Sequence, residues 1–286
     1  MNTNATQASA AGLSNSLWHV YGYSQIGSAH VRLGTINQDH VDWYADPQGQ
    51  RFAAAVADGH GAAPHFRSDM GARLAVQSAL ECLQRRLAQG SDDGSINSTA
   101  GAAIGAEIES RWNALVQAHL RTHPYVAGEE PYGNRPYGST LLAVAASPRW
   151  LVTAQIGDGD CCIGYVGQSL LRVDASQDRF QGEQTLSLCL ENAAQYFTIQ
   201  VIDLDWTSSQ PDFVVLSTDG VAKSFPSTAA YERAIAQFRD LCMSPLNRFD
   251  EVTKQIPAWL NEVSLRGSGD DATLLLAMRK LQSDVW

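Results

Sequence analysis

The stretch FAAAVADGHG, residues 52–61, decides the architecture of this chain, because an apolar run ends there at an aspartate followed by glycine. Such a run between turn residues is typical of a buried β-strand, so Phe52–Ala57 is predicted to be one. The same arrangement returns in LVTAQIGDGD, residues 151–160, and in DFVVLSTDGV, residues 212–221. A fourth stretch, GSGDDATLLLAM at residues 267–278, places two aspartates just before a strand.

Further strands and helices follow from the spacing of apolar residues. Positions 76, 80, 83 and 87 form one apolar helix face, and positions 104, 108, 112 and 115 form another. Helices are also predicted near Thr228–Cys242 and Phe249–Val263. The other predicted strands are Thr140–Ala146, Trp150–Ile156, Cys161–Val166, Leu170–Val173, Phe197–Ile202, Phe213–Ser217 and Ala272–Met278, with weaker signals at Trp18–Tyr23 and Asp42–Tyr44. Because the helices come in pairs, the pattern indicates an α+β fold with helices on antiparallel sheets.

The composition excludes several classes of protein. The 286 residues carry 20 Lys+Arg against 30 Asp+Glu, a net charge of −10, whereas nucleic-acid binding normally needs a basic surplus. No apolar stretch of about 18 residues predicts a membrane span. The five cysteines show no Cys-x-x-Cys spacing, so we expect a cytoplasmic protein without disulfides.

The chain is expected to form one domain after a short tail. Residues 1–16 have neither a basic start nor an apolar core, so they are predicted to be a flexible N-terminal tail. Residues 17–286 are predicted to be a single domain, because the chemistry described next takes residues from both sides of each candidate linker. We expect a monomer.

The acidic strand ends point to a metal site. A single Asp-Gly is a common hairpin turn, which is the alternative reading of each copy. Strand ends that meet at one sheet edge would bring the carboxylates together, and they repel one another unless a cation lies among them. Hard oxygen ligands favour Mg²⁺ or Mn²⁺, and two such ions sharing a water suit phosphate-ester hydrolysis. The candidate ligands are Asp58, Asp158, Asp219 and Asp270.

These residues resemble the motifs of the metal-dependent Ser/Thr protein phosphatases of type 2C, the PPM family. The motifs occur in the family's order over almost the whole chain: Asp58-Gly59-His60-Gly61, Gly138-Ser139-Thr140, Gly157-Asp158, Ser217-Thr218-Asp219-Gly220 and Asp270-Asp271. The resemblance implies a four-layer αββα sandwich of two antiparallel sheets flanked by helix pairs. It also implies a metal channel at one end of that sandwich.

The resemblance assigns a role to each matching position. Asp58 would bridge two ions, the Gly59 carbonyl would bind the second ion, and Asp219 and Asp270 would bind the first. Asp158 would help Asp219 hold a third, weaker ion. His60 would be the general acid for the leaving serine or threonine oxygen; its alternative is plain solvation of the turn.

Three positions depart from the family pattern. Asn37-Gln38-Asp39 replaces Asn-Glu-Asp, a variant that resembles a bacterial branch, and glutamine supplies no carboxylate for the second ion. Asp39 is retained as a catalytic-site candidate, with a surface turn as its alternative. Arg32 is the nearest candidate for gripping the phosphate, although its spacing is longer than usual. Asp271 in place of asparagine is expected to be a mild change.

The sequence therefore predicts a phosphatase that hydrolyses phosphoserine and phosphothreonine by attack of a metal-bridging water. Its substrate would be a phosphorylated protein, the product of a Ser/Thr kinase, with no nucleic acid or membrane as partner. Two alternatives stay open on the same fold. One is a catalytically weak or inactive phosphoprotein-binding module, which Gln38 motivates, and the other is a small-molecule phosphomonoesterase.

Overall fold

Two antiparallel sheets form the centre of the computed structural model, which describes residues 16–89, 98–127, 129, 133–173, 185–207, 209–244 and 246–281. The predicted N-terminal tail lies outside these residues except for Ser16, which begins the first strand. One sheet has the order β1 (Ser16–Gln25), β10 (Ala272–Leu281), β9 (Pro211–Ser217), β6 (Asp160–Tyr165) and β7 (Leu171–Arg172). The other has the order β2 (His40–Ala45), β3 (Phe52–Ala57), β4 (Leu141–Ala146), β5 (Trp150–Ile156) and β8 (Thr198–Asp203).

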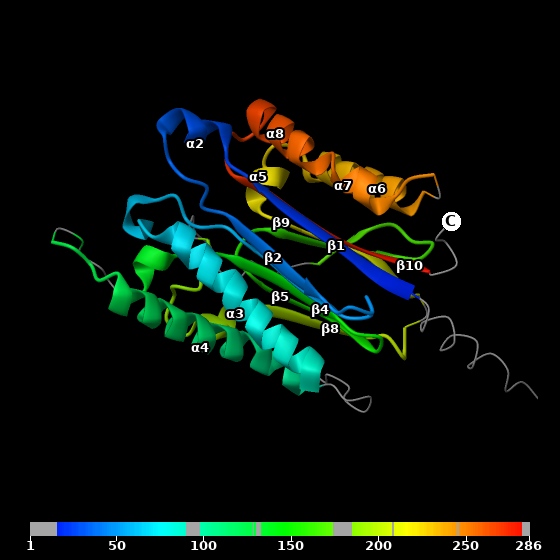
Figure 1. Ribbon diagram of the computed structural model, residues 1–286, viewed down its shortest axis with the longest axis horizontal. Coiled ribbons are helices and arrows are strands. Elements are labelled where there is room, and N and C mark those ends of the chain that lie inside the picture. Colours follow the sequence, from blue (N-terminus) through cyan, green and yellow to red (C-terminus); the bar gives the residue numbers. More distant parts are fainter. Residues whose placement is uncertain are drawn as a thin grey trace, which may run out of the picture.

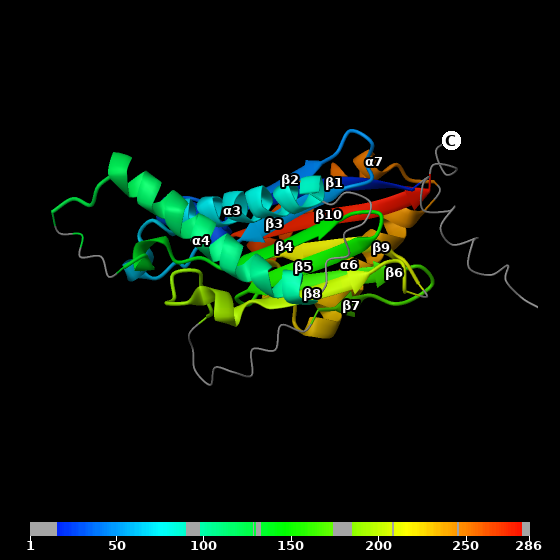
Figure 2. The same cartoon turned by 90° about the horizontal axis from the view of Figure 1, so that it is seen from below.

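Helices cover the outer face of each sheet, as Figures 1 and 2 show. The sheet from β2 to β8 carries α3 (Ser68–Gln89) and α4 (Ser98–Thr122), and the other carries α6 (Thr228–Met243), α7 (Phe249–Thr253) and α8 (Ile256–Arg266). The arrangement confirms the predicted α+β fold, a four-layer αββα sandwich. None of the helices in the described ranges is both long and apolar enough to cross a membrane.

Strand β3 shows why its sequence belongs at the centre of the sandwich. Successive side chains of a strand point to opposite faces. Phe52, Ala54 and Val56 lie in the core between the two sheets. Ala53, Ala55 and Ala57 face α3 and α4. Both faces of the strand are buried, which explains an apolar run without polar alternation.

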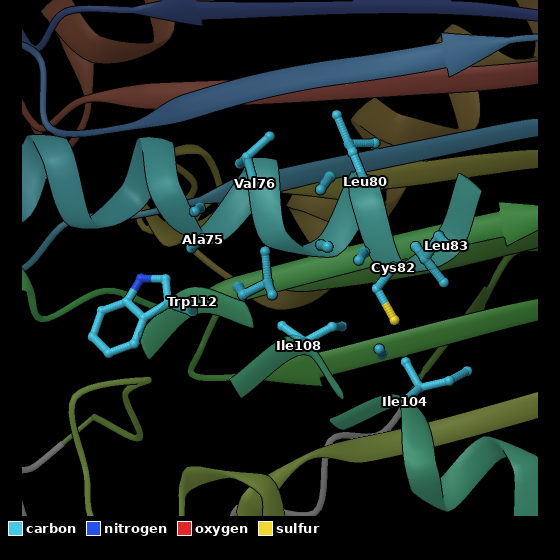
Figure 3. Close-up of a cluster of buried hydrophobic side chains, with 14 of the residues drawn as sticks. Ala75, Val76, Leu80, Cys82, Leu83, Ile104, Ile108 and Trp112 are labelled. Carbon is cyan, nitrogen blue, oxygen red and sulfur yellow. The ribbon is translucent and has the colours of Figure 1, made fainter. Parts of the chain in front are cut away.

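The helical core over β3 follows the predicted stripes. Val76, Leu80 and Leu83 of α3 belong to the same buried hydrophobic cluster as Ile104, Ile108 and Trp112 of α4 (Figure 3). The Trp112 indole N–H donates to the Gly71 carbonyl at 3.1 Å. A buried indole needs such an acceptor, so this bond fixes α4 against the first turns of α3, close to the segment that precedes β4.

The second helical layer differs from the prediction of one helix over Phe249–Val263. The structure has two helices there, α7 and α8, because Pro257 occupies the first turn of α8. Proline has no N–H to continue a preceding helix, but it fits a helix start. Two short helices were not predicted at all: α2 (Ser28–Leu33) and α5 (Asp219–Ala222).

Candidate metal centre

Strand register brings the acidic strand ends to one edge of the sandwich. His40 lies opposite Ala57, and Leu141 lies opposite Ile156, so β3 and β5 end at the same edge. In the other sheet Ser217, the last residue of β9, lies opposite both Asp160 and Leu274. The aspartates next to these ends are Asp58, Asp158, Asp219 and Asp270. We call these four and Asp39 the acidic cluster.

Asp58 lies at the electrostatic centre of this acidic cluster. Burial raises its pKa well above the ordinary value, and the charges of the other four aspartates of the cluster raise it further. The backbone on both sides of the carboxylate is fixed, because Asp58 N–H donates to Thr140 Oγ1 at 3.0 Å and Thr140 N–H donates to the Asp58 carbonyl at 2.8 Å. The predicted Gly-Ser-Thr strand start therefore positions Asp58.

Asp39 is not the surface turn residue of the alternative reading, since it is buried at the junction of the two sheets. Its Oδ2 accepts hydrogen bonds from Thr218 Oγ1 and from Thr273 Oγ1, both at 2.7 Å. Burial raises the pKa of Asp39 to about 8, against the opposing effect of these two hydroxyls, and the charges of Asp271 and Asp270 add to the rise. Asp39 thus connects the loop before β2 to β9 and β10.

Asp158 and Asp219 act on each other through their charges. Burial raises the pKa of Asp158, the charge of Asp219 raises it further, and the charge of Lys223 opposes both. Thr185 Oγ1 donates to Asp158 Oδ2 at 3.3 Å. Asp160, by contrast, turns to the strand edge, where it pairs with Arg172 of β7.

A lysine that the sequence analysis did not single out reaches the same place. Lys223 Nζ forms an ion pair with Asp219 Oδ2 one helical turn away. Burial lowers the pKa of Lys223, but the bond to Asp219 and the charges of Asp219, Asp158 and Asp58 outweigh it and raise the pKa above its usual value. An ammonium group thus already lies within reach of three carboxylates of the acidic cluster.

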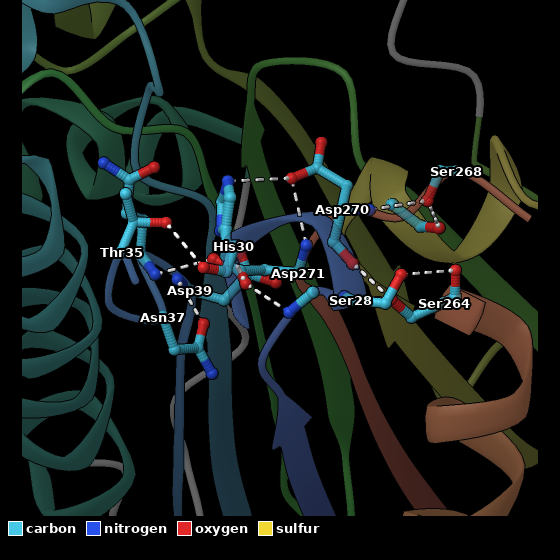
Figure 4. Close-up of polar contacts among 12 residues, drawn as sticks. Ser28, His30, Thr35, Asn37, Asp39, Ser264, Ser268, Asp270 and Asp271 are labelled. Atoms are coloured by element: carbon cyan, nitrogen blue, oxygen red, sulfur yellow. Dashed lines mark hydrogen bonds and ion pairs between the residues drawn. The ribbon is translucent and has the colours of Figure 1, made fainter. Parts of the chain in front are cut away.

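Asp270 and Asp271 have different surroundings (Figure 4). Asp270 is half exposed, and burial together with repulsion from Asp219 and Asp271 raises its pKa. Asp271 is buried and accepts from Gly27 N–H at 2.6 Å and Gln38 N–H at 2.7 Å, one on each oxygen. His30 Nδ1 lies 2.9 Å from Asp271 Oδ1, and its Nε2 lies 3.8 Å from Asp270.

Two glycines of the motifs are required by close approach. A Cβ at Gly59 would lie 2.6 Å from the Ser68 carbonyl oxygen and 2.7 Å from that of Gln38. A Cβ at Gly220 would lie 1.9 Å from the Asp271 carbonyl oxygen. Contacts this short exclude any other residue type without backbone movement. Packing, rather than turn geometry, fixes the glycines beside Asp58 and Asp219.

Gln38 holds the loop that leads to Asp39. Its side-chain Nε2 donates to Ser68 Oγ at 2.8 Å, and its backbone carbonyl accepts from the backbone N–H of Gly59 at 3.1 Å. The side chain therefore ties the loop to the start of α3. The amide makes this contact where the family pattern has a carboxylate.

His60 lies beside the acidic cluster but is neutral near pH 7. Burial, together with the neighbouring His65, lowers its pKa to about 4, although the charge of Asp219 opposes both effects. The His60 and His65 rings meet edge to face with centroids 4.9 Å apart. The backbone N–H of His60 donates to the Gly138 carbonyl. The role of His60 as a general acid stays a prediction.

Arg32 lies in α2 with an exposed side chain, and its Nη1 is 3.5 Å from Ser28 Oγ. The contacts described here join Asp39, Asp58, Asp158, Asp219 and Asp270, whereas Arg32 is at the surface. Its role towards the phosphate is a prediction that the geometry leaves open.

The donor set suits hard divalent cations. The acidic cluster offers only carboxylate oxygens, and their mutual repulsion is relieved by positive charge. The ammonium group of Lys223, which is seated on Asp219, is a stand-in cation in this structure. In the described residues no three His, Cys, Asp or Glu side chains are already arranged to hold a metal ion.

Comparison with known proteins agrees with this geometry. The family model described as protein phosphatase 2C matches residues 26–261. This match spans most of the chain and contains Asp39, Asp58, Asp158 and Asp219; Asp270 lies beyond its end. No curated protein matches the chain in sequence.

Solved structures share the fold. The serine/threonine phosphatase of S. agalactiae is 16% identical with a TM-score of 0.58, covering 91% of this chain and 99% of that one. Stp1 from Staphylococcus aureus is 11% identical with a TM-score of 0.57, covering 92% and 95%. The catalytic domain of PstP, solved with two manganese ions, is 18% identical with a TM-score of 0.53, covering 92% and 99%. At these identities the likeness establishes the fold.

Proposed function

Because this chain belongs to the protein phosphatase 2C family, and is thereby an enzyme of the phosphatase class, we propose that it removes phosphate from phosphoserine and phosphothreonine of protein substrates. One observation carries the proposal. The charges of four other aspartates raise the pKa of the buried carboxyl group of Asp58, and the five aspartates lie next to strands of both sheets. A protein gains nothing in stability by burying such an assembly unless a cation uses it.

The acidic cluster would hold two Mg²⁺ or Mn²⁺ ions, with a third bound more weakly. Asp58 is the proposed ligand of both the first and the second ion, and the Gly59 carbonyl is a proposed ligand of the second. Asp219 and Asp270 are the proposed ligands of the first ion. Asp158 would contribute with Asp219 to the third. When bound, the ions would neutralise the phosphate and lower the pKa of the bridging water that attacks it.

The chain's own residues prepare this site. Thr218 and Thr273 fix one oxygen of Asp39, so the carboxyl group cannot turn away from the acidic cluster. Burial of Asp39 keeps a proton there near neutral pH until positive charge displaces it.

His60 is the proposed proton donor to the leaving oxygen. Its ring is neutral near pH 7 without substrate, since its pKa is lowered to about 4, chiefly by burial. A phosphate dianion placed beside the ring would raise that pKa, because an anion favours the imidazolium form. His60 would then carry a proton only when substrate is bound. Arg32, exposed on α2, is the proposed phosphate contact.

The proposed setting is a monomer of one phosphatase-type domain, residues 17–286, acting in the cytoplasm on the product of a Ser/Thr kinase. All five cysteines are free thiols, which supports a reducing compartment. Neither nucleic acid nor membrane is a proposed partner.

Phosphatase assays on the purified chain test the proposal. The substrates are an aryl phosphate, a phosphoserine peptide and a phosphorylated sugar, each with Mn²⁺, with Mg²⁺ and with excess chelator. We expect peptide hydrolysis that needs the metal and that Asp58→Asn reduces by about a hundredfold or more. The exposed Asp240→Asn is the matched control.

Each contrary outcome selects a different reading. Hydrolysis that persists in chelator, or in the Asp58 variant, contradicts metal-dependent catalysis. Preference for the sugar phosphate would assign the site to a small-molecule phosphomonoesterase. Binding of the phosphopeptide without turnover would assign it to a binding module.

A further inference from the structure

Lys223 is held inside the acidic cluster by the local backbone. It follows Asp219 by four residues, and its N–H donates to the Asp219 carbonyl at 2.8 Å, which completes one helical turn at α5. Residues four apart on a helix face the same side. The turn therefore directs the Lys223 side chain back over Asp219, where Nζ pairs with Oδ2.

The ammonium group acts on more than one carboxylate. Asp158 and Asp58 are both close enough to stabilise its charge. The charge of Asp219 also raises the pKa of Asp158, whereas the charge of Lys223 lowers it. Lys223 thus occupies the Asp158–Asp219 end of the acidic cluster, where the third and weakest ion is expected.

We propose that Lys223 is a tethered cation of the metal centre, which competes with a divalent ion for the Asp158–Asp219 end. The inference rests on the proposed function, because it takes the acidic cluster to be the metal centre. An ammonium group and a divalent ion repel each other and need the same oxygens, so only one of them occupies this end at a time. While the ammonium group is in place, Lys223 supplies the positive charge that a third ion would otherwise bring.

The side chain can also leave without unfolding anything. Lys223 is 59% exposed, whereas its partner Asp219 is only 11% exposed. Four rotatable bonds allow the ammonium to move into water while the backbone of α5 stays in place. Occupation of this end by lysine or by metal is therefore a reversible exchange set by the concentration of the ion.

Metal titration of variants tests the competition directly. Mn²⁺ binding to the metal-free chain is measured by electron paramagnetic resonance of free Mn²⁺ and by calorimetry, for wild type, Lys223→Met and Lys223→Arg. Lys254→Met, at an exposed lysine after α7, is the matched control. We expect Lys223→Met to tighten the weakest Mn²⁺ site by about fivefold, the size of one exposed ion pair. Lys223→Arg and Lys254→Met should match wild type.

Thermal unfolding gives a second test, in which the proposal predicts the direction of the change in melting temperature. Without metal, Lys223→Met removes the positive charge beside three carboxylates, so its melting temperature should fall below that of wild type. Saturating Mn²⁺ should erase that difference. If Lys223→Met does not fold, as judged by circular dichroism, Lys223→Gln replaces it.

The possible failures are distinguishable. Wild type that binds no Mn²⁺ overturns the proposed function and the tethered cation together. Wild type that binds Mn²⁺ tightly, with an unchanged weakest site in Lys223→Met, overturns the tethered cation alone. A variant whose melting temperature equals that of wild type without metal also overturns it.

Discussion

The stability of the metal-free chain should fall as pH rises through neutrality, and Asp39 should be a main cause. Its pKa is raised from 3.8 in the unfolded chain to about 8 in the fold, chiefly by burial. A group whose pKa is raised on folding binds more protons when folded, so its stabilisation is complete below pH 3.8 and is lost as pH rises through about 8. Asp58 contributes in the same direction.

The magnitude follows from linkage. Between about pH 6 and about pH 8, a folded pKa near 8 against an ordinary unfolded value costs about 2 kcal/mol of unfolding free energy. Asp39→Asn should remove this slope. The amide oxygen can still accept from both threonine hydroxyls, and the amide resembles the protonated acid in shape and charge.

The assay is urea unfolding followed by circular dichroism in excess chelator at both pH values. Wild type should lose stability at the higher pH, Asp39→Asn should lose much less, and the exposed Asp240→Asn should behave as wild type. Wild-type stability that rises over this interval, or an equal loss in Asp39→Asn, would refute the reasoning.

Three further predictions concern the contacts around the site. Asp271→Asn should lower the free energy of unfolding, measured in urea, by about 1–3 kcal/mol. The amide nitrogen replaces one of the two accepting oxygens, so it cannot accept from the Gln38 or Gly27 N–H that it faces. Gln38→Glu should tighten Mn²⁺ binding in calorimetry and lower the melting temperature without metal, since it adds a carboxylate to the loop before the acidic cluster. Trp112→Phe should cost about 1–3 kcal/mol, because the buried Gly71 carbonyl loses its indole donor.

The contrary results are equally definite. Unchanged unfolding of Asp271→Asn would mean that its two oxygens are not both needed. Unchanged Mn²⁺ binding by Gln38→Glu would place that side chain outside the reach of the ions. A neutral Trp112→Phe would assign the packing of α3 and α4 to apolar contact alone.

The sequence predicted the buried strands well, for a physical reason. Phe52–Ala57 and Trp150–Ile156 were predicted with the bounds that the structure has. These strands are buried on both faces, so an apolar run between turn residues marks both of their ends. The edge strand β7 has only two residues, Leu171–Arg172, both exposed, and its predicted bounds were too wide.

Short elements were outside the reach of the same reasoning. α2 and α5 span six and four residues, which is too few for a helical period to emerge from the pattern. Lys223 was missed for this reason. Its spacing of four from Asp219 gains meaning only when the turn between them is known to be helical.

Long-range contacts set the other limit. Both oxygens of Asp271 accept backbone N–H groups from a segment about 240 positions earlier. Nothing near Asp271 in the sequence indicates Gly27 or Gln38 as partners. The threonine hydroxyls on Asp39 are a similar case, because Thr218 directly follows β9 and Thr273 lies in β10, both far from Asp39 in the sequence.

The long pairing of β1 with β10 determines how this molecule can be attached to other things. Gln25 lies opposite Ala272 beside the acidic cluster, and Ser16 lies opposite Leu281 at the other end of the ladder. Ten residues of strand span about 30 Å. Ser16 and Leu281 therefore lie at the end of the sheet far from the acidic cluster. A tether attached at Ser16 or at Leu281 would therefore hold the molecule at the opposite end of this ladder from its acidic edge.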